Sequence, residues 1–158
     1  MARLFVLPLH HTALLLGVLC GSDRVTATLT QAASNAVIAV SRYSGVDTAA
    51  PLSNVMSSNA TGVNGACSGG TDTAAYALTL PTTVDGAVVY GAVAMRQRTH
   101  TPGTGYTERA EIHQGSSGDM AGLAVEDKPV AMAAPVAVNG SFSSNVDWAV
   151  VAVDIKPQ

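Results

Sequence analysis

The chain has 158 residues, which is enough for one domain with its own hydrophobic core and too few for two. Charged residues make up 12% of it, about half of the ~25% that is usual in soluble domains, and the formal net charge is −3. The eight basic residues are scattered and aromatic residues are only 4%, so neither a phosphate-binding face nor a base-stacking platform is indicated, and we expect no nucleic-acid partner.

Polar surface is supplied mainly by hydroxyl groups, from 15 Thr and 13 Ser. This composition is typical of extracellular all-β modules, whose strands favour Thr and Val and whose turns favour Gly, Asn, Asp and Ser. We therefore expect a secreted or cell-surface protein.

Residues 1–23 form an apolar N-terminal segment with two interpretations. A basic residue near the start, an apolar run and small residues at 25–27 are the pattern of a secretory signal. The rival interpretation is a pair of early strands, at residues 4–9 and 13–19. The uninterrupted apolar run, residues 13–20, is far shorter than the ~20 residues that span a bilayer, so no membrane span is expected.

The two cysteines, Cys20 and Cys67, have no zinc-site spacing. They could form a disulfide in an oxidising compartment, provided that Cys20 is retained after processing.

Residues 24–158 are predicted to form a single β domain. Short apolar or alternating runs are separated by clusters of Gly, Asn, Ser, Asp and Pro, and no run holds a helical period with caps. The eight runs occupy residues 25–29, 36–43, 75–80, 87–97, 106–114, 121–126, 131–138 and 148–155. This spacing predicts an antiparallel sandwich or barrel with little helix.

The longest predicted loop is residues 47–72, which are rich in Ser, Asn and Gly. Oxygen ligands from Asp47, Asn64 and Asp72 would suit a calcium ion that staples this loop, although their spacing is not that of a calcium-binding motif. No other cofactor is expected.

Two predicted strands, residues 87–97 and 148–155, are apolar on both faces. A strand with one solvated face should alternate apolar with polar residues. Either these are central strands covered by loops, which is the simpler explanation, or a further layer or subunit covers them.

Ionisable residues concentrate in the stretch GYTERAEIHQG, residues 105–115. If residues 106–114 form a regular strand, Arg109, Glu111 and His113 share one face, and Glu108 lies on the other. That row could bind a sugar or an acidic polymer, but a solvated face with cross-strand ion pairs is the more frequent use of such a pattern.

Tyr106 and Trp148 complete the candidate ligand-binding set, because exposed aromatic rings stack on sugars. A lone Trp in an apolar strand is, however, more often part of a core. The segment ERAEIHQ also has a likeness to motifs of polysaccharide lyases, which need a base from a second strand; His100 and Tyr90 are the nearby candidates. Glu126 and Asp127 are interpreted as ordinary turn and edge charges.

Two longer stretches carry a family resemblance. VTATLTQAASNAVIAVSRYSGVD resembles an element of secreted bacterial β-sandwich modules in which a V-x-V-T-L strand precedes S-x-x-S-G-V-D, and SFSSNVDWAVVAVDIKP is similar to their terminal strand. The resemblance covers residues 24–157 and implies a jelly-roll-like sandwich of about eight to ten strands. Members usually carry further strands before the first element, a space that residues 1–23 occupy here.

The sequence thus favours a non-catalytic module with a structural, adhesive or self-assembly role. Assembly could proceed by strand addition from residues 4–19 to a neighbouring copy. The alternatives are a module that binds a surface polysaccharide and, with less support, a polysaccharide lyase or hydrolase that uses Arg109, Glu111 and His113.

Overall fold

The computed structural model of the chain describes residues 32–66 and 69–158, which form nine strands and one short 3-10 helix. The strands are β1 (Leu52–Asn59), β2 (Gly62–Val63), β3 (Thr73–Pro81), β4 (Ala87–Met95), β5 (His100–Pro102), β6 (Thr107–Gln114), β7 (Ala121–Val130), β8 (Pro135–Val146) and β9 (Ala149–Ile155). The helix η1 (Ser117–Asp119) connects β6 to β7. Within these ranges, no helix has the length and apolarity needed to cross a bilayer.

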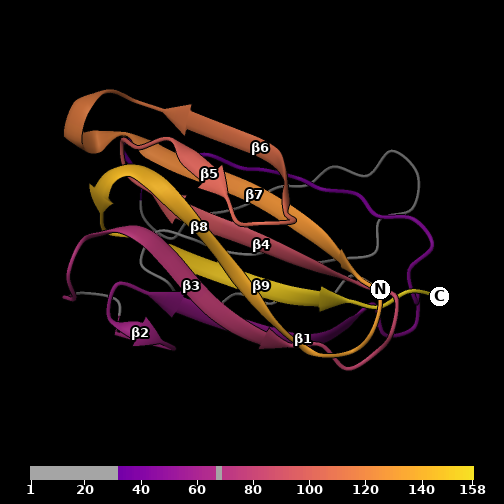
Figure 1. Cartoon of the computed structure of the whole chain (residues 1–158). Helices are drawn as coiled ribbons and strands as arrows, with labels where there is room; N and C mark the ends of the chain where they lie inside the picture. The colour runs from indigo at the N-terminus through magenta and orange to yellow at the C-terminus, as the bar shows by residue number, and fades with distance from the viewer. Residues whose placement is uncertain (1–31, 67–68) are drawn as a thin grey trace.

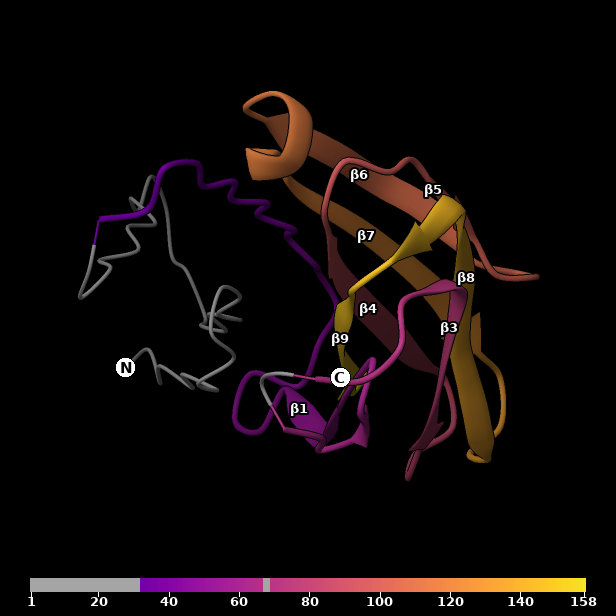
Figure 2. The same ribbon diagram turned by 90° about the vertical axis from the view of Figure 1, so that its left-hand side faces the viewer.

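The strands form two antiparallel sheets packed face to face, which confirms the predicted all-β sandwich (Figure 1 and Figure 2). The larger sheet has the order β2-β1-β9-β4-β7-β6, and the smaller has the order β3-β8-β5. After the β1–β2 hairpin, the chain passes alternately between the two sheets, apart from the β6–β7 pair. This winding is jelly-roll-like, and it places strands that are distant in the sequence next to one another.

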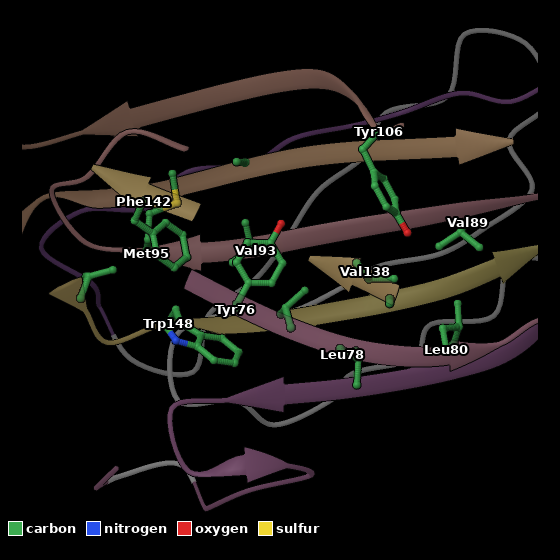
Figure 3. Close-up of a cluster of buried hydrophobic side chains, with 14 residues drawn as sticks. Tyr76, Leu78, Leu80, Val89, Val93, Met95, Tyr106, Val138, Phe142 and Trp148 are labelled. Atoms are coloured by element: carbon green, nitrogen blue, oxygen red, sulfur yellow. The ribbon is translucent and has the colours of Figure 1, made fainter. Parts of the chain in front are cut away.

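The main core lies between the sheets. In β3 the buried residues Tyr76, Leu78 and Leu80 alternate with exposed ones, because successive side chains of a strand point to opposite faces. At one end of the core the Tyr76 ring packs against Phe142 and Trp148, with ring centroids 5.5 and 5.8 Å apart (Figure 3). Tertiary packing of this kind, rather than local propensity, sets the position of each strand.

The two strands that are apolar on both faces, β4 and β9, are the central strands of the larger sheet. Their outward residues, such as Tyr90 and Val153, form a second buried cluster. Residues 36–46, called the strap below, cover this cluster with Ala39, Tyr43 and Val46 (Figure 2). The simpler explanation of the sequence pattern, central strands under a connecting segment, is therefore confirmed.

Three predicted element boundaries are wrong. The predicted loop at residues 47–72 contains β1 and β2, because the Ser- and Asn-rich β1 pairs along its length with β9. The predicted strand at residues 36–43 is the extended strap, which joins no ladder among the described residues. The predicted strand at residues 131–138 starts at Pro135 and continues to Val146, because it pairs with β3.

Several sequence-based predictions lie outside the described residues. They are the signal peptide or early strands of residues 1–23, the strand at residues 25–29, and both cysteines, Cys20 and Cys67.

Candidate functional site

The charged stretch forms β6, an edge strand of the larger sheet. Its pairing with β7 contains a bulge: Glu108 pairs with Glu126, but Ala110 pairs with Val125, so Arg109 is an extra residue. The bulge reverses the alternation of side chains. Glu108 therefore faces the interior together with Glu111, whereas Arg109 faces outward. Arg109 and Glu108 lie on opposite faces as predicted, but the prediction that Arg109 shares a face with Glu111 and His113 is wrong.

On the outward face, Arg109 forms a two-point ion pair with Asp127 of β7. Its Nε donates to one carboxylate oxygen of Asp127 at 2.9 Å, and its Nη2 lies 2.8 Å from the other. The hydroxyl of Tyr43 in the strap donates to the same carboxylate at 2.7 Å. Asp127 is only 3% exposed, so it is a buried anchor for the strap and not the exposed edge charge that was predicted.

Tyrosine-to-phenylalanine substitutions measure how much the hydrogen bond from Tyr43 to Asp127 contributes to the free energy of unfolding. We expect Tyr43→Phe to lower the free energy of unfolding by about 2 kcal/mol, because its hydroxyl donates to a charged acceptor. Tyr106→Phe is the matched control: its hydroxyl donates to the carbonyl oxygen of Ala137 at 3.0 Å, so about 1 kcal/mol is expected. Urea denaturation measures both losses, and a larger loss at Tyr106 would contradict the anchoring role of Asp127.

On the inward face, a chain of hydrogen bonds joins four strands from both sheets. Nδ1 of His100, in β5, lies 2.6 Å from a Glu108 oxygen in β6. Nε2 of the same ring lies 2.9 Å from the hydroxyl of Tyr76 in β3. That hydroxyl donates to Oε1 of Glu126 in β7 at 3.1 Å. We call these four residues the proton chain.

Two further contacts attach β5 to the carboxylates of the larger sheet. The backbone N–H of His100 donates to Glu111 at 3.1 Å, and the N–H of Gly103 donates to Glu126 at 3.4 Å. Nε2 of His113 lies 2.8 Å from the same Glu111 oxygen. Glu111 and His113 therefore lie together at the rim of the proton chain, as neighbours on the inward side of β6.

The interior position of Glu126 changes its chemistry. Glu126 is 1% exposed, and burial raises its pKa to about 7, against the opposing effect of the hydrogen bonds from Tyr76 and Gly103. Burial, followed by the nearby charge of Glu126, also raises the pKa of Tyr76. A carboxyl group that exchanges its proton near neutral pH is suited to acid–base work, but here a tyrosine, not solvent, is its hydrogen-bond partner.

Among the other predicted site residues, both aromatic ones belong to the core. Tyr106 is 9% exposed, and the Lys128 amine lies 5.4 Å from its ring centroid. Trp148 is also 9% exposed, and its Nε1 donates to the hydroxyl of Thr73 at 2.8 Å. The ligand-binding set from the sequence is therefore divided among the outward face, the inward rim and the core.

Comparisons with protein-family models, curated proteins and solved structures found no match to this chain. Its function is therefore inferred from its own geometry.

The residues proposed for a calcium site do not converge. Asp47 accepts hydrogen bonds from the N–H groups of Ala49 and Ala50 and lies near Lys156, beside the start of β1. Asn64 follows β2, at the opposite end of β1. In the ranges that the structure describes, no group of three acidic, histidine or cysteine side chains is placed to hold a metal ion.

Sequence reasoning missed Tyr76 and Glu126 as members of a polar cluster. Tyr76 sits in an apolar alternating strand, and Glu126 follows an apolar run, so each resembles a core or boundary residue. One weak signal is present in the sequence. A carboxylate at the end of an apolar run is costly to bury without a hydrogen-bond partner, so Glu126 could have been expected to have one. His100 was considered only as a base acting on an external substrate.

Proposed function

We propose that the chain is a non-catalytic β-sandwich module of a secreted or cell-surface assembly, with a structural, adhesive or self-assembly role. The observation that carries this proposal is the burial of its acid–base side chains. Tyr76, His100 and Glu126 are arranged for proton transfer, yet none is more than 6% exposed. Their hydrogen bonds connect strands of both sheets, so these side chains hold the two sheets of the sandwich together.

The outward side of the strap is the surface proposed for self-assembly. Ile38 and Val40 point away from the sheet and are 53% and 61% exposed. Among the residues that the structure describes, no backbone hydrogen bond joins residues 37–43 to another segment, and exposed apolar side chains alternate along this stretch. An open groove of about 620 Å³ runs beside it, lined on the β6 side by Arg109 and Ile112.

The proposed occupant of this surface is the strap of a second copy. Two identical extended segments pair antiparallel about a two-fold axis, and each then satisfies the backbone groups of the other. The exposed apolar row also becomes buried in such a dimer. In this arrangement the second copy lies over the strap, and the strap itself covers the larger sheet.

Light scattering of the full chain over a range of concentrations tests this proposal. We expect a dimer that dissociates on dilution, and we expect Ile38→Lys combined with Val40→Lys to make the protein monomeric, because like charges would face each other across the two-fold axis. Met132→Lys is the control, since Met132 is 74% exposed but lies in the β7–β8 connection, away from the strap.

A full chain that is monomeric at every concentration would refute self-assembly, as would equal effects of the strap and control variants. Carbohydrate binding and lyase activity stay predictions. Retention on immobilised polysaccharides tests binding, and release of cleavage products from soluble acidic polysaccharides tests lyase or hydrolase activity. Retention or cleavage that requires Arg109 and His113 would replace the assembly proposal.

A further inference from the structure

β5 forms few backbone hydrogen bonds with its own sheet. This strand has three residues, and its one partner strand in the described part of the chain is β8, which it meets through His100, Thr101 and Pro102. Pro102 has no N–H to contribute to the ladder. The position of β5 therefore depends strongly on the hydrogen bonds that it makes across the sandwich.

In the described ranges, the acceptors of these cross-sheet bonds are carboxylates of the larger sheet. The His100 ring reaches Glu108, the His100 N–H reaches Glu111, and the Gly103 N–H reaches Glu126. Two of these acceptors come from β6 and one comes from β7. Three negative charges can thus gather around one short strand.

The titratable side chains near β5 determine how the negative charges of these carboxylates are balanced. The titratable groups near β5 are Tyr76 from β3, Glu108, Glu111 and His113 from β6, Glu126 and Lys128 from β7, and Tyr106 from the β5–β6 connection. Among the described residues, no Lys or Arg side chain forms an ion pair with Glu108, Glu111 or Glu126, and Lys128 donates instead to the carbonyl oxygen of Thr104. The partners of these carboxylates among the described residues are therefore two histidine rings, a tyrosine hydroxyl and backbone N–H groups, and none of them is a permanent cation.

The Tyr76 hydroxyl has one hydrogen but contacts two groups, His100 and Glu126. It can donate to only one of them, so the other contact needs a proton on the neighbouring group. In one state both imidazole nitrogens of His100 are protonated: Nδ1–H donates to Glu108, Nε2–H donates to the Tyr76 oxygen, and the Tyr76 O–H donates to Glu126. If the Nε2 proton instead sits on Glu126, the bonds to Tyr76 run in reverse, from Glu126 to Tyr76 to His100. When that proton is absent, the imidazole has a single N–H. Either this N–H donates to Glu108 and the Tyr76 hydroxyl donates to only one of its two neighbours, or it donates to Tyr76 and the bond to Glu108 is lost. In both cases one bond of the proton chain is lost and a buried carboxylate stays ionised.

We propose that the proton chain is a pH-sensitive latch: one proton shared between His100 and Glu126 through Tyr76 holds β5 against the larger sheet, and loss of that proton releases β5 and the β5–β6 connection. Release exposes the interior rim where Glu108, Glu111 and His113 lie. The latch makes the opening of one end of the sandwich depend on the pH of the surrounding compartment.

The direction of the pH dependence follows from the raised pKa of Glu126. This pKa rises from an ordinary value of 4.5 to about 7, so the fold favours the protonated carboxyl. The stabilising contribution is complete below pH 4.5 and is lost as the pH rises through 7. The latch is therefore closed in mildly acidic conditions and open in mildly alkaline ones.

Residue-resolved hydrogen exchange of the full chain, corrected for the intrinsic pH dependence of exchange, tests the latch. The amides of His100 and Gly103 report it directly, because they donate to Glu111 and Glu126. We expect their protection to fall at least tenfold between pH 5.5 and pH 8.5. Amides of Val93 and Val151, in the central ladder of β4 and β9, should change less than twofold.

The variant Glu126→Gln removes the titrating carboxyl and keeps an acceptor for Tyr76. Its protection at residues 100 and 103 should be independent of pH, whereas Asp119→Asn, which neutralises an exposed carboxyl in η1, should keep the native pH dependence. If Glu126→Gln does not fold, Tyr76→Phe serves instead, and it should give low protection at both pH values. Protection that does not change with pH in the native chain, or that changes equally in Glu126→Gln or Tyr76→Phe, would overturn the proposal.

Discussion

Replacement of Leu80 by alanine is expected to lower the free energy of unfolding by about 3 kcal/mol. Leu80 lies at the end of β3 and is 0% exposed, within the core between the two sheets (Figure 3). The substitution removes buried methyl groups and leaves a cavity that two flanking sheets cannot easily fill by collapse. Urea or thermal unfolding measures the loss.

The matched control is Met132→Ala. Met132 is also a large apolar residue, but it is 74% exposed, so its truncation should change the free energy of unfolding by less than about 0.5 kcal/mol. Equal losses for the two variants would mean that the space around Leu80 is not the close-packed centre of the sandwich.

Replacement of Gly140 by alanine is expected to destabilise the fold by about 2 kcal/mol, which is large for one added methyl group. A Cβ at this position would lie 2.8 Å from the carbonyl oxygen of Thr101, 2.7 Å from Nε2 of His100 and 2.8 Å from a ring carbon of Tyr76. The Thr101 oxygen belongs to the backbone of the neighbouring strand, and the two rings are held in the proton chain, so none of the three moves freely.

Gly118→Ala provides the comparison. Gly118 lies in η1 with no heavy atom near its potential Cβ position, so we expect a change within about 0.5 kcal/mol. Circular dichroism during thermal unfolding measures both variants. A neutral Gly140→Ala would show that β5 can shift away from β8 without cost, which would remove the tight packing on which the proton chain depends.

Much of the fold follows from local pattern. The alternation around Tyr76, Leu78 and Leu80 predicts a strand with one buried face, and the structure has it as β3. The two runs that are apolar on both faces predict central strands, because only a central strand of a covered sheet buries both of its faces. Turn-forming residues between the runs separate most of these strands correctly.

Long-range pairing accounts for the elements that local pattern missed. β1 contains few strongly β-forming residues, yet it is a strand because its backbone pairs with β9, from Asn59 with Ala149 to Leu52 with Ile155, far along the chain. β5 is too short to show any periodicity, and it exists where β8 provides a partner. The extra residue at Arg109 is also set by the pairing of β6 with β7, and no local pattern marks it.

The proton chain is the clearest case of a site that only tertiary structure creates. Tyr76 meets Glu126 across 50 residues of sequence, in a contact between opposite sheets, and meets His100 across 24, in a contact between two strands of the smaller sheet that are not neighbours. A sequence pattern records which residues are present and which face of a strand each should occupy. It does not record which strands will face one another.

The sequence by itself therefore determined the class of fold, the scarcity of helix and the central position of β4 and β9, because each of these follows from composition and from the two-residue period of a strand. The tertiary structure decided that Arg109 faces outward to Asp127, that the strap covers the second apolar face, and that Tyr76, His100 and Glu126 are buried together with Glu108 at their edge. The physical reason is that strand pairing and sheet packing are non-local: their free energy depends on partners that no short stretch of sequence contains.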